Sequence, residues 1–358
     1  MTLARMFFPA AFGLAACAHP PAAATATASS PPPASSIQAP GPARLTAEPL
    51  PLPGASGPAA LDFIFHERAR DRVWVPAGAT GSVDVLDVAT GHFTRVPGFK
   101  TEEREAHGKK RVVGPSSGSI GEGFAYIGNR AGSEVCPVDL GTLTPSPCLQ
   151  LASSPDGVQY VASAHEVWVT LPKDQTIAVL DASNAGVLKL KDAIKLDGSP
   201  ECYALDDTRG VFFTNLEDKG GTLALDVKTR QVTATWSPGC GPDGPRGVVF
   251  DPKHDFVIVA CTDHVQVLDA GKGGARLGAF DTGPGLDAID YVADTSLLYA
   301  AAGKAERLSV LRVNEAGELQ VVAEGATSKG ARNAVADARG DVYVADSEQG
   351  RLLVFRRR

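Results

Sequence analysis

The chain has 358 residues, of which 44% are hydrophobic and 6% aromatic, and its formal net charge at pH 7 is −7. Because proteins that bind nucleic acid present a basic surface, this acidic balance excludes nucleic acid from the expected partners. The 38 glycines and 26 prolines indicate many turns together with one compositionally biased segment.

Residues 1–16 have the pattern of an export signal. Arg5 supplies a positive charge, and residues 6–16 form an apolar stretch that is too short to span a bilayer as a helix. The stretch ends in Leu14-Ala15-Ala16-Cys17, which resembles the lipobox of bacterial lipoproteins. That resemblance implies cleavage before Cys17 and a diacylglycerol on its thiol, whereas the alternative is an ordinary signal peptide with a chance cysteine. Acyl chains hold a protein firmly to a membrane.

The resemblance also bears on location. By the sorting rule of enteric bacteria, Ala18 rather than an aspartate after Cys17 favours the outer membrane. Residues 17–42 then consist almost entirely of Ala, Pro, Ser and Thr with very little charge. Such a segment buries too little apolar area to offset its ordering entropy, and its prolines keep it extended. We therefore expect residues 17–42 to be a disordered tether between the acylated Cys17 and a folded domain over residues 43–358.

The folded domain repeats a unit of about 40 to 45 residues with four short strands and no helical periodicity. The second strands of seven units align at residues 73–75, 125–127, 167–169, 212–214, 257–259, 298–300 and 342–344. Seven units of four strands predict an all-β fold, a seven-bladed β-propeller of four-stranded antiparallel blades. A basic run at residues 109–111 is expected in a solvated loop after the first blade.

Closure of the ring can be predicted by counting strands. The last unit supplies strands near 334–336, 342–344 and 352–355 and then ends, so it lacks a fourth strand. An unassigned extended stretch at residues 44–50 precedes the first unit. We expect this N-terminal strand to complete the last blade, where Pro49 is tolerable because the fourth strand is an outer edge. A β-helix or a sandwich would not explain both a missing strand and a spare one.

Two units resemble YVTN repeats, in which a Tyr-Val-Thr-Asn-like strand leads through a polar loop to Val-Ile-Asp. They are HEVWVTLPKDQTIAVLDASNAGVLKL at residues 165–190 and GVFFTNLEDKGGTLALDVKTRQVTATW at residues 210–236, and the similarity extends over roughly residues 61–358. The resemblance implies a propeller that acts outside the cytoplasm as a binding or scaffold protein. Related lactonase-like propellers include sugar lactonases.

Candidate site residues follow from the propeller geometry. Each first strand begins on one face beside the central channel, and each second strand ends on that face. The first-strand entries are Asp62, Ser117, Asp156, Glu201, Arg246, Asp287 and Arg332, and Asn215 lies at a second-strand end. We expect this rim to bind a small polar ligand, with Arg246 and Arg332 as clamps for a carboxylate or phosphate. Alternatively, these polar side chains only solvate one another.

A metal is the second possibility for the same rim. Asp156, Glu201, Asp287 and Asn215 offer oxygen ligands of the kind that calcium prefers. Gluconolactonase-like propellers use a comparable set on a divalent ion that polarises the lactone carbonyl, but their motif has no residue-by-residue match here. We therefore expect a binding or scaffold protein at the cell envelope, for a small ligand or an envelope protein, without a cofactor. A metal-dependent lactonase-like hydrolase is the alternative.

Five cysteines follow Cys17, and an oxidising compartment would favour disulfides among them. Cys136 and Cys148 map to adjacent strands of the second blade, so a disulfide between them is expected first. Cys202, Cys240 and Cys261 all map near the top of the fourth and fifth blades. We expect the second disulfide to be Cys202–Cys240, which leaves Cys261 as a buried thiol. A three-thiol metal site with His264 is the alternative.

Overall fold

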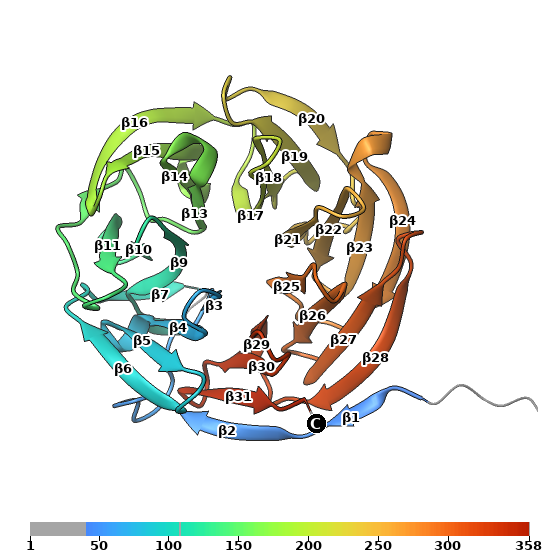
Figure 1. Ribbon diagram of the computed structural model, residues 1–358, viewed down its shortest axis with the longest axis horizontal. Helices are drawn as coiled ribbons and strands as arrows, with labels where there is room; N and C mark the ends of the chain where they lie inside the picture. The colour runs from blue at the N-terminus through green and yellow to red at the C-terminus, as the bar shows by residue number, and fades with distance from the viewer. Residues whose placement is uncertain (1–40, 107–108, 358) are drawn as a thin grey trace, which may run out of the picture. The chain divides into compact units, whose positions relative to one another are not determined.

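Short strands that are buried along most of their length form a ring of seven sheets around a central channel (Figure 1). The computed structural model describes residues 41–106 and 109–357, so Cys17 and nearly all of the expected tether lie outside the described residues. The predicted seven-bladed propeller of antiparallel blades is confirmed. No helix in the described part of the chain is long and apolar enough to cross a membrane.

The blades follow one another along the chain, each from its inner to its outer strand. Blade 1 contains β3 (Phe65–Glu67), β4 (Arg72–Ala77), β5 (Ser82–Asp87) and β6 (His92–Pro97). Blade 2 contains β9 (Pro115–Gly121), β10 (Phe124–Asn129), β11 (Glu134–Asp139) and β12 (Leu149–Gln150). Blade 3 contains β13 (Val158–Val161), β14 (Glu166–Leu171), β15 (Thr176–Asn184) and β16 (Val187–Lys195). Blade 4 contains β17 (Pro200–Asp206), β18 (Val211–Leu216), β19 (Gly221–Asp226) and β20 (Val232–Trp236).

The remaining blades complete the circle. Blade 5 contains β21 (Pro245–Asp251), β22 (Phe256–Cys261), β23 (His264–Asp269) and β24 (Ala275–Asp281). Blade 6 contains β25 (Ile289–Val292), β26 (Leu297–Ala302), β27 (Arg307–Val313) and β28 (Leu319–Ala326). Blade 7 contains β29 (Arg332–Ala336), β30 (Val342–Asp346) and β31 (Arg351–Phe355) from the C-terminal end of the chain.

The core lies between neighbouring blades rather than at the ring centre. Side chains of the second and third strands project from both faces of each sheet, and most are fully buried. Trp74 and Trp168, in the second strands of blades 1 and 3, each donate an indole N–H to a buried glutamate at 2.9 Å. Burial of a tryptophan requires such a partner for its N–H, so these pairs allow the largest side chains to enter the core.

Ring closure is carried by two N-terminal strands, where the sequence predicted one. β2 (Ala47–Pro51) pairs antiparallel with β31 and completes blade 7, as expected. β1 (Ala43–Leu45) instead pairs parallel with β28 and becomes a fifth strand of blade 6 (Figure 1). Gly325 of β28 makes this junction possible, because a Cβ there would lie 2.5 Å from the ring of Phe355 in blade 7. The N-terminal segment thus joins the two blades that flank the chain ends.

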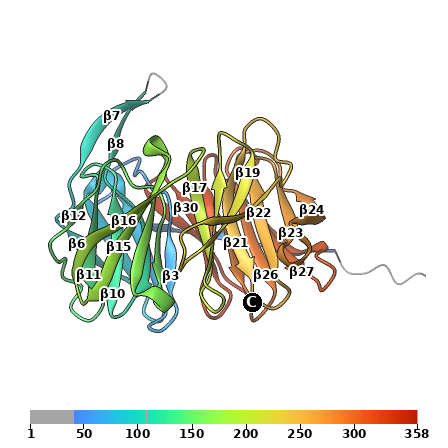
Figure 2. The same cartoon turned by 90° about the horizontal axis from the view of Figure 1, so that it is seen from above.

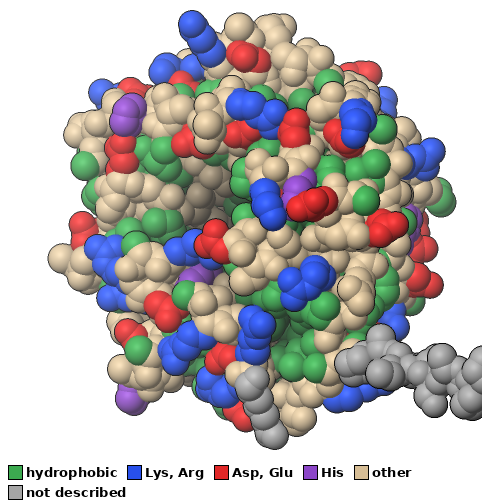
Figure 3. Space-filling view, turned by 45° about the vertical axis from the view of Figure 1, so that its right-hand side comes forward, with side chains coloured by type: hydrophobic (Ala, Val, Ile, Leu, Met, Phe, Trp, Pro, Cys, Tyr) green, Lys and Arg blue, Asp and Glu red, His purple; other side chains and the backbone are tan. Residues whose placement is uncertain are grey.

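A hairpin stands on the ring between blades 1 and 2 (Figure 2). It consists of β7 (Glu102–Ala106) and β8 (Lys109–Val113), so the basic run that was expected in a loop lies on a strand. Arg104 anchors the hairpin by donating to the carbonyl of Arg130 at 2.8 Å and to the hydroxyl of Ser154 at 3.3 Å. Elsewhere, basic and acidic side chains are interspersed over the face shown in Figure 3.

The disulfides agree with the sequence-based expectation in one case and differ in the other. Cys136 and Cys148 are joined across blade 2. The expected Cys202–Cys240 bond is wrong, because Cys240 is joined to Cys261 and the buried Cys202 is free. All three side chains lie in one buried cluster, but Cys202 occupies a β-bulge of β17, a local distortion that residue spacing does not reveal.

The cysteine arrangement predicts a specific labelling pattern. In the unreduced full chain, iodoacetamide should modify Cys202 only after unfolding, because its thiol is buried in the native state. Peptide mapping by mass spectrometry should find Cys240 and Cys261 unmodified and linked to each other. Labelling of Cys261 instead would show that the pairing described here is incorrect.

The closing strand should contribute measurably to stability. Leu50 of β2 packs against the buried cluster between blades 7 and 1, whereas Leu190 of the outer strand β16 is 62% exposed. We expect Leu50→Asp to lower the free energy of unfolding by about 2 kcal/mol, because it removes apolar burial from the ring closure. The same change at Leu190 should cost about 0.5 kcal/mol or less. Equal losses in urea unfolding would contradict a special role for β2.

Candidate ligand site at the channel mouth

Three charged residues reach the channel mouth from irregularities in the inner strands. The pairing register shifts beside Glu201 in β17, beside Arg246 in β21 and beside Arg332 in β29. In β17 and β29 the next residues, Cys202 and Asn333, have positive φ angles of 46° and 63°. Bulges of this kind interrupt the strand ladder and turn a side chain in a new direction, so they commonly occur beside functional sites.

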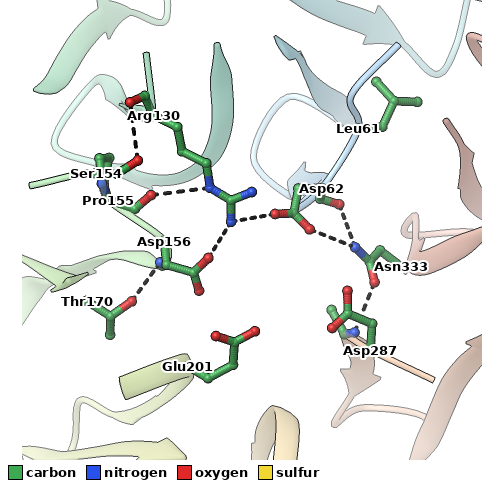
Figure 4. Close-up of polar contacts among 12 residues, drawn as sticks. Leu61, Asp62, Arg130, Ser154, Pro155, Asp156, Thr170, Glu201, Asp287 and Asn333 are labelled. Atoms are coloured by element: carbon green, nitrogen blue, oxygen red, sulfur yellow. Dashed lines mark hydrogen bonds and ion pairs between the residues drawn. The ribbon is translucent and has the colours of Figure 1, made fainter. Parts of the chain in front are cut away.

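Three aspartates reach the same opening from the segments that lead into inner strands. Asp62, Asp156 and Asp287 precede β3, β13 and β25 respectively. Figure 4 shows these aspartates and Glu201 arranged around a common space, with Asn333 between Asp62 and Asp287. Asn333 donates to the carbonyl of Asp62 at 2.8 Å and accepts the backbone N–H of Ala288 at 2.9 Å. The amide therefore holds blades 1, 6 and 7 in register at the mouth.

Arginines bridge the aspartates. Arg130, which directly follows β10, contacts Asp62 at 2.6 Å and also pairs with Asp156 (Figure 4). Arg332 contacts Asp287 at 3.1 Å and lies 3.9 Å from Asp62. Arg130 was not among the site residues predicted from the sequence. The available signal was a basic residue immediately after a second strand, where the chain emerges on the mouth face.

Arg246 is shared unequally between two glutamates. It pairs closely with Glu217, while its nearest contact with Glu201 is 3.8 Å, beyond hydrogen-bond distance. No hydrogen bond reaches the Glu201 carboxylate from residues 41–106 or 109–357. The two arginines that were expected to clamp an anion, Arg246 and Arg332, thus already hold carboxylates of the protein. An incoming anion would have to displace those partners.

Asn215 does not face the mouth. Its side-chain amide donates to the carbonyls of Arg246 and Gly247 at 2.7 and 3.1 Å, and its oxygen accepts the hydroxyl of Thr222 at 2.7 Å. Asn215 is fully buried, so these bonds use its amide to hold blade 4 against blade 5. Asn215 therefore has a structural role and not the expected ligand role.

Burial raises the pKa of three carboxylates at the mouth, those of Asp156, Glu201 and Asp287. Removal from water raises the pKa of Asp156 to about 6, against the opposing effect of Arg130. For Glu201, removal from water and then the charges of Asp156, Asp287, Glu217 and Asp62 raise the pKa to about 9. Burial also raises the pKa of Asp287. The mouth therefore holds more acidic groups than its arginines neutralise.

The arrangement does not match a calcium or catalytic zinc site. Among the His, Cys, Asp and Glu side chains of the described residues, only Glu134, Cys136 and Cys148 bring three potential ligand atoms within 4.8 Å of one another, and the two cysteines are joined as a disulfide. Calcium requires six to eight converging oxygens. At the mouth, arginine side chains stand between the carboxylates and Asn215 points away. These residues do not fit the divalent ion of a lactonase-like enzyme.

A cavity of about 250 Å³ lies in the channel directly below the mouth. Its upper wall includes Phe63, Cys202, Gly247, Ala288 and Asn333, each of which immediately follows one of the charged mouth residues along its inner segment. The other lining residues are mostly apolar but include His66, Arg68 and Asp290. Drug-sized ligand sites usually occupy about 300 to 1,000 Å³, so this cavity suits a small molecule.

Comparisons with known proteins define the class of this molecule by its fold. No family model matches the chain, and no curated protein matches it. Among solved structures, a chain of the mitotic checkpoint complex has a TM-score of 0.69 at 12% identity, covering 94% of this chain and 98% of its own. Kuenenia stuttgartiensis hydrazine synthase has a TM-score of 0.68 at 14% identity, with coverages of 86% and 99%.

The structure of a lyase is similar to this chain to about the same degree. Virginiamycin B lyase from Staphylococcus aureus has a TM-score of 0.67 at 12% identity, covering 88% of this chain and all of its own length. The chain is thus a seven-bladed β-propeller. At these identities the likeness establishes the fold alone, because propellers of one architecture serve unrelated functions.

The raised pKa of Glu201 predicts how stability depends on pH. The native state retains a proton on Glu201 up to about pH 9, whereas the unfolded chain releases it above its ordinary pKa of 4.5. Stability should therefore fall as the pH rises through this range. Glu201→Gln should abolish that loss and exceed the wild type in unfolding free energy by about 2 kcal/mol at pH 9, with little difference at pH 5.

Urea unfolding at the two pH values measures this effect. Glu48→Gln is the matched control, because Glu48 lies on the outer edge of blade 7 with 63% of its side chain exposed. If the difference in unfolding free energy between Glu201→Gln and the wild type is the same at both pH values, Glu201 is ionised in the native protein.

Proposed function

We propose that this protein is a binding propeller of the cell envelope, which holds a small ligand at the channel mouth and has no catalytic role. The observation that carries the proposal is the position of an incompletely neutralised set of charges directly above a small cavity lined by both apolar and polar residues. Cavities with apolar walls and a few convergent polar groups are the usual form of small-molecule sites. The propeller fold is consistent with binding or scaffolding.

The location is proposed from the sequence. The lipobox-like Leu14-Ala15-Ala16-Cys17 and the Pro- and Ala-rich residues 17–42 support export and lipid anchoring, with the outer membrane favoured by Ala18. The YVTN-like units at residues 165–190 and 210–236 support a role outside the cytoplasm. An envelope protein bound elsewhere on the surface is compatible with this proposal, because the mouth occupies only one part of the ring.

Lipid anchoring predicts a clear effect of Cys17→Ser. The full-length variant should lose incorporation of an alkyne-labelled fatty acid and move from the membrane fraction to the soluble fraction, because no acyl chain holds it. Its circular dichroism spectrum should remain that of a β-propeller, since the folded ring begins after residue 41. Retention of the label, or loss of folding, would contradict the proposed separation of anchor and propeller.

The absence of catalysis is tested with the purified wild-type protein. Simple lactones should be hydrolysed no faster than in buffer, with or without added calcium or zinc. Hydrolysis well above that background, abolished by a chelator and by Glu201→Ala or Asp156→Ala, would overturn the binding proposal. It would instead favour the metal-dependent lactonase-like function.

A further inference from the structure

The mouth contains more carboxylates than arginines, and one of the carboxylates has no close arginine partner. Three arginines, Arg130, Arg246 and Arg332, face five carboxylates from Asp62, Asp156, Glu201, Glu217 and Asp287. Each arginine is committed to a closer partner than Glu201, whose nearest guanidinium nitrogen is 3.8 Å away. Glu201 is therefore the acidic group without a matching cation in the protein.

A second and independent observation points to the same place. Asp156 is only 7% exposed, and one of its carboxylate oxygens, Oδ2, is buried without a hydrogen-bond partner in the described part of the chain. Arg130 occupies the other oxygen. Figure 4 shows the free oxygen of Asp156 on the side that faces Glu201. A buried carboxylate oxygen normally accepts a hydrogen bond, so this one lacks its donor.

The cavity below the mouth favours a ligand with an apolar group. Phe63, Val248, Ala288 and Ile289 are among the apolar side chains that line the 250 Å³ cavity. A bare ion or a hydrated metal gains nothing from such a wall, whereas a hydrocarbon group is stabilised there by about 25 cal/mol for each square ångström it buries. The complementary ligand combines a hydrogen-bond-donating positive charge with a compact apolar group.

We propose that the channel mouth binds a small organic cation, an ammonium or guanidinium, between Asp156 and Glu201 with its apolar part in the cavity below. This inference rests on the proposed binding function and names its ligand class. The cation would donate hydrogen bonds to Oδ2 of Asp156, which has no donor, and to Glu201, whose nearest guanidinium nitrogen is 3.8 Å away. Removal from water, and then the charges of its acidic neighbours, raise the pKa of Glu201, so a proton takes this place in the absence of a ligand.

Two other classes of ligand, an anion and a divalent metal, fit the mouth less well than an organic cation. An anion would meet arginines that already hold Asp62, Asp156, Asp287 and Glu217. A divalent metal would need oxygen ligands that converge more closely than those of the mouth. An ammonium with an alkyl or aryl group needs only two acceptors and an apolar wall, and both are present.

Isothermal titration calorimetry on the full chain tests the ligand class. The probes are 2-phenylethylamine, the uncharged 2-phenylethanol, the anionic 3-phenylpropanoate and calcium chloride alone, all at pH 7.5. We expect measurable binding only for the amine. Asp156→Asn and Glu201→Gln should each weaken it about tenfold or more, because each removes a charged acceptor from the ammonium. Glu48→Gln, which removes one exposed carboxylate far from the mouth, should leave the affinity unchanged.

Other outcomes overturn the proposal in distinguishable ways. Tighter binding of the alcohol or the carboxylate, sensitive to the mouth substitutions, would refute the cationic class while supporting a ligand at this site. Binding of calcium alone would refute the organic cation and favour a metal. An amine affinity that is the same in Asp156→Asn and in the wild type, or no binding by any probe, would also refute it. The lactone and fractionation experiments decide the proposed function separately.

Discussion

The antiparallel pairing of β2 with β31 is the constraint on which the rest of the structure depends. A propeller has no layer above or below its sheets, so each blade is stabilised by the two blades that flank it. Without β2, blade 7 would present an unpaired strand edge and blades 1 and 7 would lose part of their shared core. Closure fixes the angular position of every blade, and hence the distance between residues that face one another across the channel.

That fixed geometry allows the mouth to hold groups that would separate in water. Asp62, Asp156, Glu201 and Asp287 bring carboxylates together from four different blades, 1, 3, 4 and 6. Their mutual repulsion and loss of hydration destabilise the native state. The ring tolerates this destabilisation because the apolar core between its blades stabilises the native state independently of the mouth. A site that is costly in the empty state and that lacks donors is well prepared for a ligand that supplies them.

The sequence predicted the architecture because a propeller is periodic and position within a blade corresponds to position in space. The spare strand near residue 45 and the missing one after residue 355 indicated closure correctly, although the split into β1 and β2 was not foreseen. The same correspondence placed Glu201 and Asp287 at the mouth. It failed where a local distortion decides the outcome. Cys202 lies on a bulge and remains free while Cys240 pairs with Cys261, and the Asn215 side chain donates to the backbone of blade 5.

The order of the two N-terminal strands along the chain has a mechanical consequence. A pulling force applied ahead of residue 41 reaches the three-residue pairing of β1 with β28 before it reaches β2. Blade 6 already has four strands without β1, so detachment of β1 would lengthen the chain without opening the ring. Under load β1 would therefore detach first, while β2 stays paired with β31 and the propeller stays closed.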